Sequence, residues 1–142
     1  FYGGGQERGL RPGTIPVPLV AGFSLAAKIL SNDKDWFNEC SNIKSQIIEK
    51  ISKKVIINGN QDYAMPNILN LSITSYDSEA LIVMLKDKIS ISNGSACTSS
   101  SYQPSHVLKS MNLDDNIIKS AIRISWSKDT NYSFIDFEQY LD

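Results

Sequence analysis

Apolar residues recur at helical spacing in two stretches of the first half of the chain. Residues 19–30 are apolar on nearly every side of a helical cylinder, which predicts a mostly buried helix after Pro16 and Pro18. Asp33 or Asp35 can cap a second helix, in which the apolar residues lie three or four positions apart: Trp36, Cys40, Ile43, Ile47 and Ile51. Cys40 lies on this stripe and is therefore expected in the core. Lysines on the opposite face are expected to be solvated, namely Lys44, Lys50, Lys53 and Lys54.

Short apolar segments in the rest of the chain have the pattern of β-strands: residues 55–57, 67–73, 89–91 and 121–126. Helices are expected between and after them. They are a helix capped by Asp77, one over residues 103–111 with Pro104 in its first turn, one from Asp114, and one over residues 132–141. The sequence therefore predicts an α/β small domain, in which helices pack on a short β-sheet.

Cys97 lies in a run of small and polar residues that separates two apolar segments. Such a run, over about residues 92–103, is typical of an exposed and mobile loop, so the thiol is expected to be accessible and able to move. A Ser/Gly-rich linker that happens to contain a cysteine accounts for the same composition.

Arg123 stands in the middle of a predicted strand, between two isoleucines that face the other side. A guanidinium fixed on a strand is well suited to bind a carboxylate through two hydrogen bonds, although a solvent-facing arginine fits the pattern equally well. His106 is expected on a helix surface rather than in a catalytic role.

Composition narrows the class of protein. With 142 residues, 42% hydrophobic and 20% charged, the chain suffices for one compact domain. Fourteen basic and fifteen acidic residues give a net charge of -1, so no direct nucleic-acid partner is expected. No membrane association, metal site or disulfide framework is expected either, and a reducing, cytoplasmic setting is the default. Because the chain opens on Phe1 without an initiator Met, we expect a fragment or a cleaved product.

Five of the eight glycines lie in residues 3–14, where backbone can approach a ligand or another chain closely. This segment is followed in the chain by three further motifs: Pro66-Asn67-Ile68-Leu69-Asn70, Gly94-Ser95-Ala96-Cys97-Thr98 and Ile122-Arg123-Ile124-Ser125. The ordered set resembles the carboxy-terminal part of NifS/IscS-type cysteine desulfurases, which are pyridoxal-phosphate enzymes of fold-type I in the class V aminotransferase family.

The resemblance implies removal of sulfur from L-cysteine, which leaves L-alanine and a persulfide on the enzyme for transfer to an acceptor protein. It assigns Cys97 as the catalytic sulfur acceptor, Arg123 as the residue that binds the substrate carboxylate, and Thr14 as a ligand of the cofactor phosphate across a homodimer. Residues 1–14 would then be the tail of the large cofactor domain and a dimer-interface loop, and residues 15–142 the carboxy-terminal small domain. The lysine that binds pyridoxal phosphate covalently lies upstream of this chain, so the fragment alone is expected to be inactive.

Other functions remain open from the sequence. A non-catalytic sulfur-carrier or interaction module would use Cys97 to receive sulfur from another enzyme, and a selenocysteine lyase-type or cysteine sulfinate-acting relative would share much of the pattern. Within the desulfurase interpretation, iron–sulfur cluster assembly, tRNA thiolation and DNA phosphorothioation are all possible destinations of the sulfur.

Overall fold

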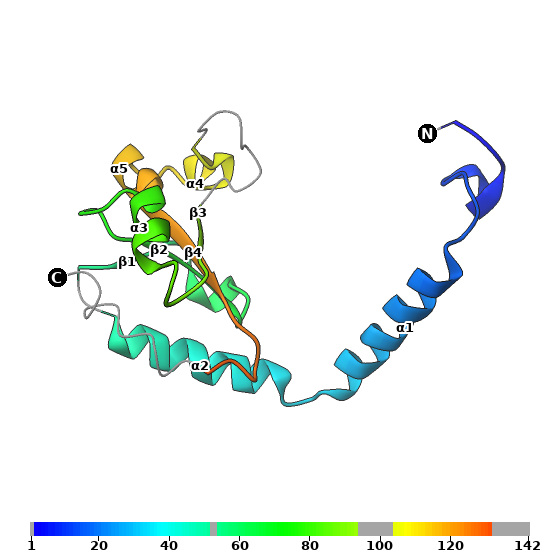
Figure 1. Ribbon diagram of the computed structural model, residues 1–142, viewed down its shortest axis with the longest axis horizontal. Helices are drawn as coiled ribbons and strands as arrows, with labels where there is room; N and C mark the ends of the chain where they lie inside the picture. Colours follow the sequence, from blue (N-terminus) through cyan, green and yellow to red (C-terminus); the bar gives the residue numbers. More distant parts are fainter. Residues whose placement is uncertain (1, 52–53, 94–103, 132–142) are drawn as a thin grey trace. The chain divides into compact units, whose positions relative to one another are not determined.

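The computed structural model describes residues 2–51, 54–93 and 104–131 (Figure 1). The chain forms two compact units, Phe1–Asp35 and Trp36–Asp142, and each is described by itself below. The expected helix over residues 132–141 and most of the expected cysteine loop, including Cys97, lie outside the described residues.

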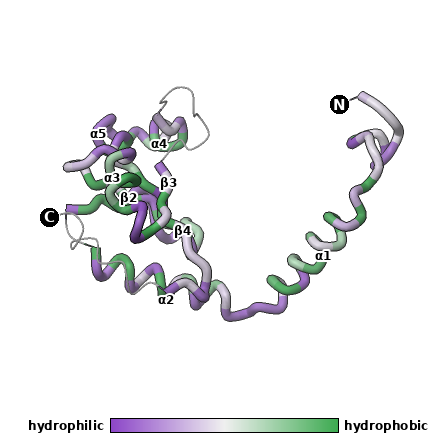
Figure 2. The backbone as a smooth tube through the Cα atoms, in the orientation of Figure 1, coloured by the Kyte–Doolittle hydropathy of each residue, from purple (hydrophilic) through white to green (hydrophobic). Residues whose placement is uncertain are grey.

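The first unit contains a short 3-10 segment, η1 (Gln6–Gly9), and a long helix, α1 (Val17–Asn32). The helix begins directly after Pro16 and has Pro18 in its first turn, as the sequence predicts. The expectation that it is mostly buried is wrong for this chain, because none of its residues is buried. Apolar residues follow its whole length (Figure 2), and Phe23 is 77% exposed. An all-round apolar pattern is typical of a helix that is covered on most sides in its complete fold.

The second unit is a four-stranded antiparallel sheet with helices on both faces. Its strand order is β1-β2-β4-β3. The fold class predicted from the sequence is confirmed. The elements in chain order are α2 (Trp36–Lys50), β1 (Ile56–Ile57), η2 (Gln61–Tyr63), β2 (Ile68–Ser72), α3 (Ser78–Leu85), β3 (Ser92–Asn93), α4 (His106–Ser110), α5 (Asp115–Lys119) and β4 (Ala121–Ser125).

Two local predictions need correction. The third strand is Ser92–Asn93 rather than residues 89–91, because these are the residues that pair with β4. Pro104 does not lie in the first turn of α4: it precedes Ser105, whose hydroxyl caps the helix by accepting from the Leu108 N–H at 3.4 Å.

One face of the sheet carries the main hydrophobic core. Leu69 and Leu71 of β2 and Ile122 and Ile124 of β4 are at most 2% exposed. They pack with residues of α2 and α3, namely Cys40, Ile43, Ile47, Leu81 and Leu85. Cys40 is thus a core residue, as expected. The alternation of inward and outward residues in β2 and β4 follows the period of two that a half-buried strand requires.

Lys44 of α2 is buried, although the sequence suggested a solvated position. Its Nζ donates to the Met65 carbonyl at 3.1 Å, and Met65 belongs to the segment between η2 and β2. Lys44 comes four residues after Cys40 and three before Ile47, so it lies beside the buried stripe of α2 and not on the opposite face, which corrects the sequence prediction. Burial lowers the pKa of Lys44 from its ordinary value, because desolvation disfavours the charged ammonium.

Candidate functional site

The opposite face of the sheet is mixed in character, and Arg123 lies at its centre. Ala121 packs at one end of this face with Leu108 of α4 and Ile118 of α5 in a small separate cluster. Arg123, two residues further along β4, is exposed, whereas its neighbours Ile122 and Ile124 are buried on the core side. The prediction that Arg123 faces away from these isoleucines is confirmed.

Strand pairing places polar side chains on both sides of Arg123. Asn70 of β2 and Ser92 of β3 are its direct partners in the antiparallel register. Asn58 follows β1, and its backbone N–H donates to the Asn70 carbonyl at 2.9 Å, which continues the ladder by one residue. Side chains opposite each other in adjacent strands are about 5 Å apart on the same face. The four residues Asn58, Asn70, Arg123 and Ser92, here called the polar row, therefore cross the sheet from β1 to β3.

Three residues of the polar row, Asn58, Asn70 and Arg123, line a pocket of about 320 Å³. Its apolar wall comes from α4 and the turn after it. The pocket is lined by Asn58, Gly59, Asn70, Asn93, Ser105, Val107, Leu108, Met111 and Arg123. A concave site with an apolar wall and a few convergent polar groups is the usual form of a small-molecule site.

The guanidinium of Arg123 has only one hydrogen-bond partner among the residues that the structure describes. Its Nη2 donates to the Ser92 Oγ at 3.2 Å, and no described carboxylate forms an ion pair with it. Its remaining N–H groups are donors, and a guanidinium has no acceptor. The arrangement can therefore bind a carboxylate or another small anion at the pocket.

A chain of hydrogen bonds connects the polar row to Ser72 and to the backbone of Ile117. The Ser72 hydroxyl donates to the Ile117 carbonyl at 2.7 Å, so its oxygen is left to accept from the Asn58 Nδ2, also at 2.7 Å. The same Nδ2 donates to the Asn70 Oδ1 at 2.7 Å. Asn58 is only 7% exposed, and its own Oδ1 is buried without a hydrogen-bond partner among the described residues.

Thr14 lies in the first unit, in an exposed turn that follows Gly13. Gly13 has φ +102, a backbone conformation that favours glycine. Two side chains hold this turn: the Gln6 Oε1 accepts from the Gly13 N–H at 3.1 Å, and the Arg11 Nη1 donates to the Gly13 carbonyl at 2.8 Å. The turn therefore presents the Thr14 hydroxyl on a supported backbone.

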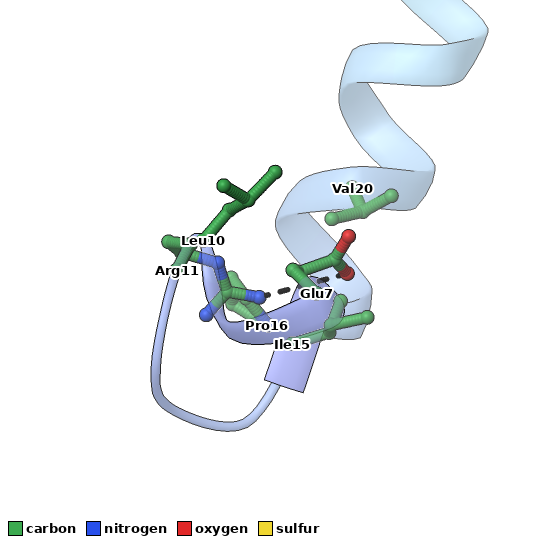
Figure 3. Close-up of a pocket in the computed structure, with 6 residues that line it drawn as sticks. All are labelled: Glu7, Leu10, Arg11, Ile15, Pro16 and Val20. Atoms are coloured by element: carbon green, nitrogen blue, oxygen red, sulfur yellow. Dashed lines mark ion pairs between the residues drawn. The ribbon is translucent and has the colours of Figure 1, made fainter. Parts of the chain in front are cut away.

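A second pocket, of about 650 Å³, lies in the first unit (Figure 3). It is lined by Glu7, Leu10, Arg11, Ile15, Pro16 and Val20. Glu7 and Arg11 form an ion pair at 3.9 Å, drawn as a dashed line in Figure 3. Both charged groups are about half exposed, so this pair contributes little to stability.

The structure thus describes two of the three residues assigned from the sequence. Arg123 lies in a pocket of the second unit and Thr14 in a turn of the first, and Cys97 lies outside the described residues. Asn93 ends the described chain before Cys97, and Ser105 lies just after it resumes; both line the Arg123 pocket. His106 is exposed at the start of α4, as expected.

Sequence reasoning did not identify Asn58, Asn70 and Ser92 as site residues. For Asn70 a signal exists, because it is a polar position in an alternating strand and the last residue of the motif Pro66-Asn67-Ile68-Leu69-Asn70 that contributes to the family resemblance. Ser92 is the first residue of the predicted cysteine loop, although nothing in the sequence indicated its contact with Arg123. No local signal marks Asn58. Across the residues described, no group of three metal-ligating side chains occurs. None of the helices in this part of the chain has both the length and the apolar character that a membrane crossing requires.

Comparison with known proteins extends these observations. A family model described as aminotransferase class-V matches residues 4–135. The chain is 39% identical over 144 residues to the cysteine desulfurase IscS of Rickettsia bellii, a match that covers 95% of this chain and 34% of the relative. The solved structure of a NifS-like protein from Rickettsia africae is similar with a TM-score of 0.83 at 28% identity, over 99% of this chain and 39% of that one.

A further solved structure, described as SspA in complex with cysteine, is similar with a TM-score of 0.56 at 29% identity, over 88% of this chain and 34% of that one. The chain spans between 30% and 34% of the length of the curated relatives it matches.

Proposed function

Because the chain belongs to the class-V aminotransferase family, we propose that it is the carboxy-terminal part of a cysteine desulfurase. The complete protein would remove sulfur from L-cysteine, release L-alanine and carry the sulfur as a persulfide on Cys97. The relatives named cysteine desulfurase, at 35% to 39% identity, support this assignment. The observation in this chain that carries it is the guanidinium of Arg123, which faces a pocket without a carboxylate partner among the described residues.

Arg123 would bind the substrate carboxylate. Its contact with Ser92 restrains one Nη, so the planar group is oriented before substrate arrives and less rotamer freedom is lost on binding. A carboxylate at this position directs the rest of an α-amino acid along the pocket. The structural neighbour described in complex with cysteine is consistent with an amino acid of this size.

Cys97 would be the sulfur acceptor. Its thiolate forms a bond to the substrate sulfur, the carbon–sulfur bond breaks with its electron pair left on carbon, and that carbon takes up a proton to become the methyl group of L-alanine. The sulfur remains as a persulfide on Cys97, from which an acceptor protein removes it. The proposed mechanism requires the Cys97 thiolate to reach the substrate sulfur and the persulfide then to reach an acceptor protein, and small residues surround Cys97 in the sequence.

Thr14 would hold part of the cofactor. Members of this family generally depend on pyridoxal phosphate, which supplies an electron sink when bound. The exposed turn with Gly13 at positive φ fits a phosphate, because the backbone can approach closely and the Thr14 hydroxyl can donate a hydrogen bond. In the proposed homodimer this phosphate belongs to the opposite subunit, and residues 1–14 lie at the interface. The covalent lysine would come from the part of the protein upstream of this chain.

The exposed apolar surface of α1 supports a larger complete fold. Its residues would be covered by the large cofactor domain that the family resemblance implies, and this chain spans only 30% to 34% of the length of its relatives. The proposed protein therefore needs both parts for activity.

The test uses the complete protein that contains this chain, loaded with pyridoxal phosphate and given L-cysteine. We expect L-alanine and a mass increase of one sulfur atom on the peptide that contains Cys97. Cys97→Ala is expected to abolish both the persulfide and sulfur transfer. Cys40→Ala is the matched control, because Cys40 is the other cysteine of this chain and is buried in the core.

A persulfide that survives Cys97→Ala and is lost in Cys40→Ala would contradict the assignment of the acceptor. Absence of L-alanine from the loaded wild-type protein would refute the proposed reaction as a whole.

A further inference from the structure

The side-chain amide of Asn70 has a defined orientation in the polar row. Its Oδ1 accepts a hydrogen bond from the Asn58 Nδ2 at 2.7 Å, so the oxygen faces β1. Because the amide is planar, the Nδ2 of Asn70 lies on the other side, toward β4 and its register partner Arg123. No described group accepts a hydrogen bond from this Nδ2.

The orientation is set from the backbone rather than by the Asn70 side chain. The Ile117 carbonyl can only accept, so it takes the Ser72 hydroxyl hydrogen, and the Ser72 oxygen can then only accept from Asn58. This makes the Nδ2 of Asn58 the donor toward both Ser72 and Asn70. The Oδ1 of Asn58 is left buried without a described hydrogen-bond partner.

At the centre of the polar row, the N–H groups of Arg123 and the Nδ2 of Asn70 are hydrogen-bond donors without an acceptor between them among the described residues. Arg123 uses one Nη for Ser92 on its β3 side, and its other N–H groups share the pocket with the Nδ2 of Asn70 on its β2 side. Both residues line the same pocket, and neither group can accept from the other. An anionic oxygen between them would satisfy both.

We propose that Asn70 is a second substrate-binding residue, whose Nδ2 donates to the carboxylate that Arg123 binds, and that Asn58 and Ser72 are positioning residues for its amide. The inference rests on the proposed function, since the anion is taken to be the carboxylate of L-cysteine. A neutral donor beside the guanidinium fixes which oxygen of the carboxylate faces β2, and with it the direction of the amino acid in the pocket.

Asn70→Asp in the complete, cofactor-loaded protein is the most direct test. The aspartate side chain keeps the shape of asparagine and the oxygen that accepts from Asn58. The substitution replaces the Nδ2 donor with a second carboxylate oxygen, which repels the substrate carboxylate. We expect the KM for L-cysteine to rise at least about tenfold, because one charge-assisted hydrogen bond to the carboxylate is lost, and we expect a smaller change in kcat. Asn116→Asp, on the exposed surface of α5, is the matched control for one added negative charge and should leave KM unchanged.

Cysteamine separates a carboxylate contact from a general disturbance of the pocket. It has the amine and thiol of L-cysteine and lacks the carboxylate. Asn70→Asp should therefore not raise the inhibition constant of cysteamine measured in competition with L-cysteine. If the KM for L-cysteine and the inhibition constant of cysteamine rise together, Asn70 does not act through the carboxylate and the inference is wrong.

A double-mutant cycle tests the positioning role of Asn58. Asn58→Ala alone should raise the KM for L-cysteine, because the Asn70 amide can then turn over, and it should have no further effect in an Asn70→Ala background. Equal effects of Asn58→Ala in both backgrounds would overturn this part. Asn70→Ala also replaces the aspartate variant as the test if that variant does not fold.

The outcome separates the inference from the function on which it rests. If the wild-type protein makes L-alanine and Asn70→Asp leaves KM within about twofold, the inference fails and the proposed function stands. If the loaded wild-type protein makes no L-alanine from L-cysteine, both fail.

Discussion

Replacing Arg123 with glutamine in the complete protein is the sharpest test of the substrate site. The side chain keeps much of its length and remains polar, but it loses the charge and the forked donor geometry. We expect the KM for L-cysteine to rise by about a hundredfold, because a carboxylate bound through two charge-assisted hydrogen bonds loses about 1.5 kcal/mol or more for each, and about 1.4 kcal/mol corresponds to a factor of ten.

The structure also predicts what this substitution leaves unchanged. Arg123 is exposed and its one described hydrogen bond is to Ser92 at 3.2 Å, whereas the buried neighbours Ile122 and Ile124 hold β4 in the sheet. The melting temperature should therefore stay close to that of the wild type. Arg123→Lys keeps the charge but not the fork, so we expect an intermediate rise in KM of about tenfold.

The assay is the initial rate of L-alanine formation over a range of L-cysteine concentrations. Lys109→Gln removes one positive charge from the exposed surface of α4 and is the matched control. A KM for Arg123→Gln within about threefold of the wild type, in a protein that melts normally, would refute the view that this guanidinium binds the substrate carboxylate.

Three further predictions concern the stability of the second unit, measured by urea unfolding of the chain. Leu71→Ala should cost about 2–5 kcal/mol because Leu71 is fully buried, whereas Val83→Ala, at 65% exposed, should change the unfolding free energy by less than about 0.5 kcal/mol; equal effects would refute the core assignment. Asp77→Ala should cost about 1 kcal/mol because its Oδ1 caps α3 at 2.9 Å, and Asp77→Asn should restore most of this; an asparagine no better than alanine would argue against the cap. Lys44 binds fewer protons in the folded state than in the unfolded state, since burial lowers its pKa. The unfolding free energy of the wild type relative to Lys44→Met should therefore rise as the pH increases from the folded pKa toward the ordinary lysine value, and parallel pH profiles of the two proteins would contradict this. Loss of the hydrogen bond to the Met65 carbonyl adds a pH-independent cost to the variant.

The sequence by itself determined the elements whose burial has a simple period. The stripe of α2 and the alternation of β4 predicted which side of each faces the core, because a helix repeats every 3.6 residues and a strand every two. It also placed Arg123 on the outward side of its strand and indicated the family through four motifs in one order. These properties depend only on residues that are close together in the sequence.

Only the tertiary structure decided what surrounds Arg123. Asn58, Asn70 and Ser92 come from three other strand segments, and Ser92 lies 31 positions from the arginine that it contacts. Their meeting depends on strand order and register, which are set by the core on the opposite face rather than by any local pattern. The helical spacing of Lys44 to Cys40 and Ile47 already indicated its burial, whereas its hydrogen bond to the Met65 carbonyl depends on a segment that is remote in sequence. For α1 the helix was predicted correctly and its burial was not, because burial depends on the surface that covers a helix, and the sequence of the helix does not specify that surface.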